Sequence, residues 1–146
     1  MKALMFAALL AASAGANADG LYAYAGAWSE HFSSDQFEET HNLTALEYRS
    51  YMAGYFRNSY GEDSVFAAKR WSWDYGNWQA GVAVGAVYGY RSCIKGWDDQ
   101  SRRICPMVAP SLVYTEYAVQ PSLLVMGKAL VFTVRTDLDA IFGALQ

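Results

Sequence analysis

The chain contains 146 residues, of which 53% are hydrophobic, and its 11 basic and 14 acidic residues give a formal net charge of −3 at pH 7. This length is enough for one domain with one core. Arg102-Arg103 is the only notable basic cluster, so the charge pattern excludes the positive surface that a nucleic-acid partner requires.

The N-terminal segment is typical of a secretory signal peptide. It begins Met1-Lys2, continues through a short apolar stretch and reaches the small-residue pattern Ala16-Asn17-Ala18 before Asp19. The apolar stretch is too short for a good membrane-spanning helix, and no later segment offers the roughly twenty apolar residues that such a helix needs. We therefore expect residues 1–18 to be removed and residues 19–146 to form a single exported domain.

Beyond Asp19 the sequence predicts strands. Aromatic residues, Val, Thr and Gly dominate, turn residues recur at short intervals, and there is little helical periodicity. The segments expected to be extended are Leu21–Phe32, His41–Arg49, Tyr51–Ser59, Asp63–Trp73, Asn77–Tyr90, Pro106–Glu116, Ser122–Gly127 and Ala129–Thr136. About eight strands make the smallest closed transmembrane barrel. The predicted fold is therefore all-β, an eight-stranded antiparallel up-and-down β-barrel.

The segment from Asn77 to Tyr90 has the clearest alternation. One face is expected to carry Trp78, Ala80, Val82, Val84, Ala86, Tyr88 and Tyr90. The aromatic residues of this face either form girdles at a membrane interface or fill a core, and the pattern leaves both open. The opposite face is mostly small. Its Gly81 and Gly85 either let neighbouring strands pack or leave room for a ligand chain along the wall.

Two cysteines, Cys93 and Cys105, flank the polar stretch "IKGWDDQSRRI". In an exported chain such a pair is expected to close its loop as a disulfide. Two thiols with both histidines far away in sequence offer too few ligands for a zinc site. We expect neither a metal nor a cofactor.

Four stretches resemble one known family, the bacterial outer-membrane lipid A palmitoyltransferase and its small barrel relatives in phages and proteobacteria. They are "WSEHF", "YMAGYFRNSYGEDSVFAAKRW", "GVAVGAVYGY" and "PMVAP", which together extend from Trp28 to Pro110. In that family a palmitoyl chain moves from a phospholipid to lipid A. The chain is measured inside the barrel, and a His, an Asp and a Ser lie at the extracellular rim.

The resemblance implies acyl transfer, for which a serine needs a base and donors for the oxyanion. Ser59 matches the family's Ser and His31 its His, although His31 lies two places later relative to the Trp. Asn58 stands where the family has Asp, and an amide orients a donor but cannot balance an imidazolium. Pro106 and Pro110 match proline-flanked gaps through which lipid chains are thought to enter.

Less specific interpretations remain open for the same residues. Asn58 and Ser59 are ordinary turn formers, His31 is then a lone rim histidine, and His41 in "FEETHN" is a reserve candidate. The resemblance implies a monomer in the outer membrane, or in the periplasm, with phospholipid and lipid A as partners. The alternatives are a non-catalytic barrel, possibly phage-encoded, that binds lipid or alters the host surface, and a soluble periplasmic β-domain.

Overall fold

The computed structural model describes residues 20–31, 42–58, 61–90, 103–127 and 129–145, without the side chains of 27–31, 103 and 144. The elements are β1 (Leu21–His31), β2 (Leu43–Tyr48), β3 (Tyr51–Arg57), β4 (Asp63–Tyr75), β5 (Trp78–Tyr90), β6 (Arg103–Tyr114), β7 (Val119–Met126), β8 (Ala129–Asp137) and α2 (Leu138–Ala144). The expected signal peptide, residues 1–18, lies outside the described residues.

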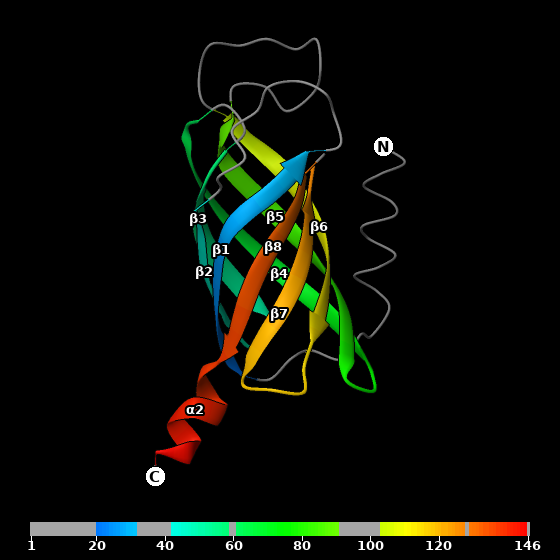
Figure 1. Ribbon diagram of the computed structural model, residues 1–146. Helices are drawn as coiled ribbons and strands as arrows, with labels where there is room; N and C mark the ends of the chain where they lie inside the picture. The colour runs from blue at the N-terminus through cyan, green and yellow to red at the C-terminus, as the bar shows by residue number, and fades with distance from the viewer. Residues whose placement is uncertain (1–19, 32–41, 59–60, 91–102, 128, 146) are drawn as a thin grey trace.

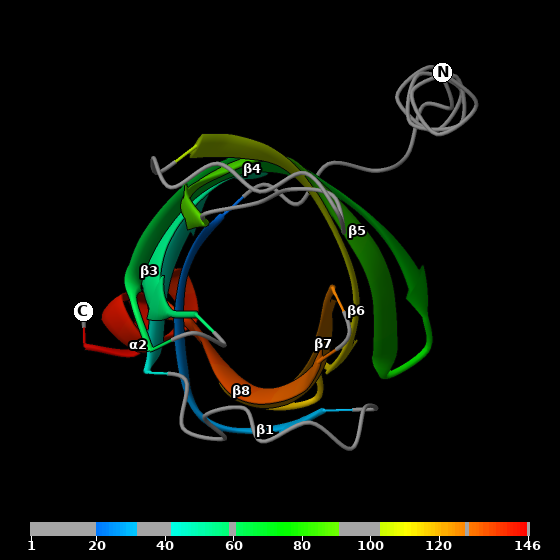
Figure 2. The same cartoon turned by 90° about the horizontal axis from the view of Figure 1, so that it is seen from above.

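The eight strands form one closed barrel in the order β1 to β8. Each strand pairs antiparallel with the next one in the chain, and β1 closes the barrel by pairing with β8. Figure 2 shows the strands surrounding a common axis. The predicted all-β, eight-stranded antiparallel up-and-down barrel is therefore confirmed.

The two ends of the barrel differ. At the lower end of Figure 1, where β1 begins and β8 ends, the two-residue turns Arg49-Ser50 and Gly76-Asn77 connect β2 to β3 and β4 to β5. Arg49, Ser50 and Gly76 have φ values of 49°, 72° and 61°, the left-handed conformations that two-residue hairpins use. Strands β1, β3 and β5 end at the opposite, upper end.

A short helix that the sequence analysis did not predict follows the last strand. Asp137 caps α2, because its carboxylate accepts a hydrogen bond of 3.0 Å from the Ala140 N–H. Asp139 accepts a second one, of 2.8 Å, from the N–H of Leu21 in β1. Seven helical residues give only two turns of pattern, so periodicity alone could not reveal this helix.

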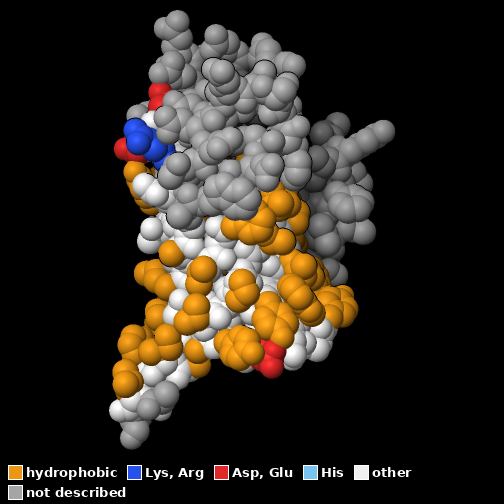
Figure 3. Space-filling model, viewed as in Figure 1, with side chains coloured by type: hydrophobic (Ala, Val, Ile, Leu, Met, Phe, Trp, Pro, Cys, Tyr) orange, Lys and Arg blue, Asp and Glu red, His pale blue; other side chains and the backbone are white. Residues whose placement is uncertain are grey.

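The outward face of the barrel is apolar, and Figure 3 shows hydrophobic side chains over one side of it. The exposed large apolar residues of the strands are Leu46, Tyr48, Tyr51, Tyr55, Val65, Tyr75, Trp78, Tyr88, Ile104, Val108, Leu112, Val119, Phe132 and Val134. The polar side chains buried inside are Glu47, Ser64, Arg70, Ser72, Gln79, Gln120, Ser122, Thr133 and Arg135. Apolar side chains therefore lie on the outward face, and charged side chains lie in part of the interior.

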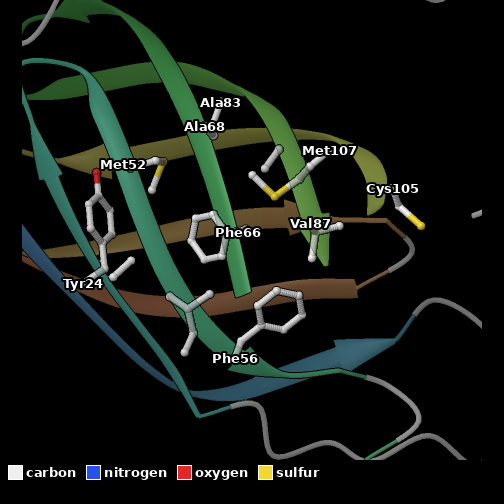
Figure 4. Packing of buried hydrophobic residues seen from close by; sticks show 12 residues of the cluster. Tyr24, Met52, Phe56, Phe66, Ala68, Ala83, Val87, Cys105 and Met107 are labelled. Atoms are coloured by element: carbon white, nitrogen blue, oxygen red, sulfur yellow. The ribbon is translucent and has the colours of Figure 1, made fainter. Parts of the chain in front are cut away.

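The upper half of the interior is filled with apolar side chains. Phe56 and Phe66 pack with ring centroids 6.0 Å apart, and Val87 and Met107 belong to the same cluster, which Figure 4 shows. Between this cluster and Arg70 lies a cavity of only about 10 Å³, about the space of one water molecule.

The side chain of Tyr90 points inward, to the opposite face from the one that the alternation of β5 predicts. Tyr88 is exposed, but the register shifts between Tyr88 and Tyr90, where Gly89 has a φ of 127°. The extra residue turns Tyr90 inward, so that its ring centroid lies 6.3 Å from that of Phe56. The prediction that Tyr90 shares the face of Trp78 and Tyr88 was wrong.

Candidate functional site

Asn58 directly follows β3 at the upper end and is fully buried. Its Nδ2 donates to the Ser64 hydroxyl at 3.1 Å and to the Gly89 carbonyl at 3.2 Å. Its Oδ1 accepts from the Glu62 N–H at 3.1 Å, and its backbone N–H donates to the Glu62 carbonyl at 2.8 Å. Asn58 thus fastens the β3–β4 connection to the bulge of β5.

These contacts give a physical reason for Asn at position 58, where the resemblance implies Asp. The Nδ2 group donates to a backbone carbonyl, a bond that a carboxylate oxygen cannot make because it has no hydrogen to donate. An aspartate here would direct a negative oxygen at the Gly89 carbonyl in a buried site. The amide is therefore suited to holding the turn, whatever further role Asn58 has.

The other two predicted catalytic residues can be placed only along the chain. His31 is the last residue of β1, paired with Ala129 of β8, and its side chain is outside the described residues. Ser59 follows Asn58 and lies outside the described residues, as does His41. The topology brings the end of β1 and the end of β3 to the same upper rim. The catalytic roles stay predictions.

Gly81 and Gly85 face inward, where the space beside each is occupied. A Cβ atom on Gly81 would lie 2.5 Å from Nη2 of Arg70. On Gly85 it would lie 2.0 Å from the carbonyl oxygen of Ala67 and 2.5 Å from the Cα of Ala68. Both glycines thus allow close packing inside the barrel, and a role in holding an acyl chain stays a prediction.

Pro106 and Pro110 lie in β6 beside the shortest ladder of the barrel. Both stand opposite β5 residues in an unbroken register, yet β6 pairs with β7 only from Ser111 to Val113. A proline has no N–H to donate to a neighbouring strand, which limits the ladder on the β7 side. Among the described residues, the β6–β7 seam therefore has the shortest ladder of the barrel wall.

An apolar groove of about 860 Å³ crosses this seam on the outside of the barrel. It is lined by side chains of β6, β7 and β8, among them Leu112, Leu123 and Phe132, with Trp78 at one side and Thr44 on the other. Apart from hydroxyl and amide groups, its lining is hydrophobic, so an acyl chain fits its chemistry.

A buried polar cluster fills the lower half of the barrel and was missed by the sequence analysis. Gln79 Oε1 accepts from Nη1 of Arg70 at 3.0 Å and from Nη1 of Arg135 at 2.7 Å. Glu47 accepts a hydrogen bond from the Tyr24 hydroxyl, and its other oxygen lies 3.8 Å from Nη1 of Arg70. The available signal was alternation, which sets Glu47 on the face of Leu43 and Ala45.

Only one of the two predicted disulfide cysteines belongs to the described residues. Cys105 is inward-facing and disulfide-bonded, and its expected partner Cys93 lies outside the described residues. Among the residues that the structure describes, no group of three or more His, Cys, Asp or Glu could hold a metal ion. No helix in the same part of the chain is long and apolar enough to cross a membrane.

Comparison with known proteins does not assign the chain. No model of a known protein family matches it, and no curated protein is recognisably similar.

Proposed function

We propose that this chain is an integral outer-membrane β-barrel that binds envelope lipid along its outer surface without transferring an acyl group. The observation that carries the proposal is the outward face of the barrel, which is apolar while the charged Glu47, Arg70 and Arg135 side chains lie inside. Strands of transmembrane barrels alternate in this sense.

Two further features support the membrane proposal. Aromatic side chains gather at the lower end, where the Trp78 and Tyr114 ring centroids lie 5.0 Å apart, and Tyr55 and Tyr88 lie nearer the upper end. Such girdles mark the two interfaces of membrane barrels, whose turns on the periplasmic side are short. The short turns Arg49-Ser50 and Gly76-Asn77 assign the lower end to the periplasm in this proposal.

The non-catalytic part of the proposal is supported by the filled interior. An enzyme that measures an acyl chain inside the barrel needs a channel along the axis. Here Phe56, Phe66, Val87 and Met107 occupy the upper half, and the cavity between this cluster and Arg70 holds about one water molecule. The outer groove at the β6–β7 seam is the larger space for an acyl chain.

Val108→Arg tests the membrane proposal. Val108 is 51% exposed in the middle of β6. An arginine there is expected to lower the free energy of unfolding by about 2 kcal/mol if lipid surrounds it, but by less than about 0.5 kcal/mol if water does. Urea unfolding of protein reconstituted in phosphatidylcholine vesicles measures the difference.

The matched control is Leu145→Arg, an exposed position that follows α2, beyond the strands. It should have little effect in either environment, because it lies outside the apolar band. Equal effects of the two arginines, or a wild-type chain that remains in the aqueous phase after export, would contradict membrane insertion.

Acyl transfer is the second candidate function. Two observations favour it: the ends of β1 and β3, which carry His31 and lead to Ser59, lie at one rim, and the β6–β7 ladder is short. In this case Ser59 attacks the ester carbonyl of a phospholipid while His31 takes its proton. The ester C–O bond then breaks, and His31 gives the proton to the lysophospholipid that leaves. In the second half His31 takes the proton of an acceptor hydroxyl, which attacks the acyl-serine ester, and returns it to the departing Ser59 oxygen.

Mass spectrometry of lipid A and phospholipids from expressing cells distinguishes the two candidates. The proposal of a non-catalytic barrel expects no new acylated lipid from the wild-type chain. A new acylated lipid that disappears with both Ser59→Ala and His31→Ala, while the barrel still folds, would replace it with the acyltransferase.

A further inference from the structure

A lysine stands alone on the outward face of β4. Its outward residues from Val65 to Tyr75 are otherwise Val, Ala, Trp or Tyr, and Lys69 is the one charged side chain among them. The Lys69 ammonium lies 5.4 Å from the ring centroid of Tyr51 and 5.4 Å from that of Trp71. Two aromatic rings from two strands thus hold one cation on an apolar surface.

The cluster continues onto the neighbouring turn. Tyr51 is paired with Lys69 across β3 and β4, and with Tyr48 across β2 and β3. The Arg49 guanidinium lies 5.5 Å from the ring centroid of Tyr48, which is 58% exposed. The pair of tyrosines is therefore flanked by a cation on each side.

The direction of the Lys69 side chain is informative. Trp71 lies two residues nearer to the lower end of β4, and Tyr51 begins β3 at that end. The ammonium thus contacts the ring across the ladder and the ring nearer to the lower aromatic girdle, a position from which a lysine can extend toward headgroups. In the described part of the chain, no carboxylate lies within ion-pair distance of Lys69 or Arg49.

We propose that Lys69, Tyr51 and Trp71, with Arg49 beside them, form a binding site for the phosphate headgroup of an anionic phospholipid in the leaflet at the lower end. The ammonium and the guanidinium pair with the phosphate, and the rings pack against the glycerol and the first acyl carbons. This inference rests on the proposed membrane insertion and specifies which lipid the barrel retains.

The test compares lipid retained by the folded chain. Wild-type protein is inserted into phosphatidylcholine vesicles with a minor fraction of phosphatidylglycerol and extracted in mild detergent, and native mass spectrometry measures the bound lipid. We expect the phosphatidylglycerol fraction on the protein to exceed that in the vesicle. Lys69→Gln should reduce this enrichment about fivefold, the effect of losing one cation near a charged headgroup.

Two variants control for folding and for net charge. Lys69→Arg keeps the cation and should keep the enrichment, whereas Arg57→Gln removes a cation at the upper end and should leave the enrichment unchanged. An enrichment that survives Lys69→Gln, or that falls equally with Arg57→Gln, would overturn the site.

The two proposals fail differently. Insertion is measured separately, as the fraction of the protein that stays with the vesicles after a urea wash. Inserted wild-type protein without phosphatidylglycerol enrichment overturns only the lipid site. A chain that does not insert overturns the membrane proposal and the lipid site with it.

Discussion

Replacing Glu47 with glutamine is expected to lower the free energy of unfolding by about 3–5 kcal/mol, the typical effect of removing one partner of a buried ion pair. Glu47 is fully buried. In the described residues, the other charged side chains of its cluster are those of Arg70 and Arg135. Asp74 is linked to this cluster through a hydrogen bond from Gln79. The Gln79 oxygen binds both guanidinium groups, so two like charges lie close together. Without the Glu47 charge, they face each other in a medium of low dielectric constant.

The matched control is Glu116→Gln, the same change at an exposed carboxylate at the lower end. It should alter the free energy of unfolding by less than about 0.5 kcal/mol. Arg70→Gln in the Glu47→Gln background then measures the coupling, which should be about 0.5–3 kcal/mol for contacting charges. Urea unfolding that gives Glu47→Gln and Glu116→Gln the same stability would mean that water penetrates the lower half of the barrel.

The strands and their order could be predicted because apolar and polar residues alternate along the sequence of several strands. In β2, apolar or buried positions recur at every second residue from Leu43, and in β3 Met52 and Phe56 share one face. Turn residues separate the runs, and strands joined by short turns pair with their chain neighbours. Eight such strands allow closure, so the barrel followed from the sequence.

Which face is inside could not be predicted from β5 alone. A row of Trp, Ala, Val and Tyr suits a core in water as well as a surface in lipid. The structure shows which face points inward through residues on other strands, because Glu47, Arg70 and Arg135 share the inward face with Gly81. A charged residue on the apolar face of one strand does not identify the inward face; several strands that bring such residues together do.

The candidate site was harder to predict for a different reason. The pattern at Asn58 is the same for a turn and for a catalytic helper, since both need a short polar side chain at a strand end. Only the hydrogen bonds to Ser64, Gly89 and Glu62 show that the amide holds the turn. Likewise, the inward rotation of Tyr90 depends on a one-residue bulge, which the alternation of β5 does not reveal.

Gly85→Ala is expected to destabilise the folded barrel by about 3 kcal/mol or more, at the upper end of the effect of overpacking. The new methyl group would lie 2.0 Å from the carbonyl oxygen of Ala67 and 2.5 Å from the Cα of Ala68. Both atoms belong to the backbone of β4, which is held by its ladders to β3 and β5. The methyl group can therefore be accommodated only by moving one strand away from another.

The control for this substitution is Gly143→Ala, where no atom lies within 4 Å of the added methyl group. Because Gly143 is in α2, alanine there should be neutral or stabilise by up to about 1 kcal/mol. The comparison also separates the two interpretations of Gly85. If the glycine lined an acyl-chain channel, Gly85→Ala would fold normally and shorten the chain that the protein accepts. If it allows β4 and β5 to pack, as its surroundings indicate, the variant unfolds at lower urea concentration in vesicles that contain no substrate.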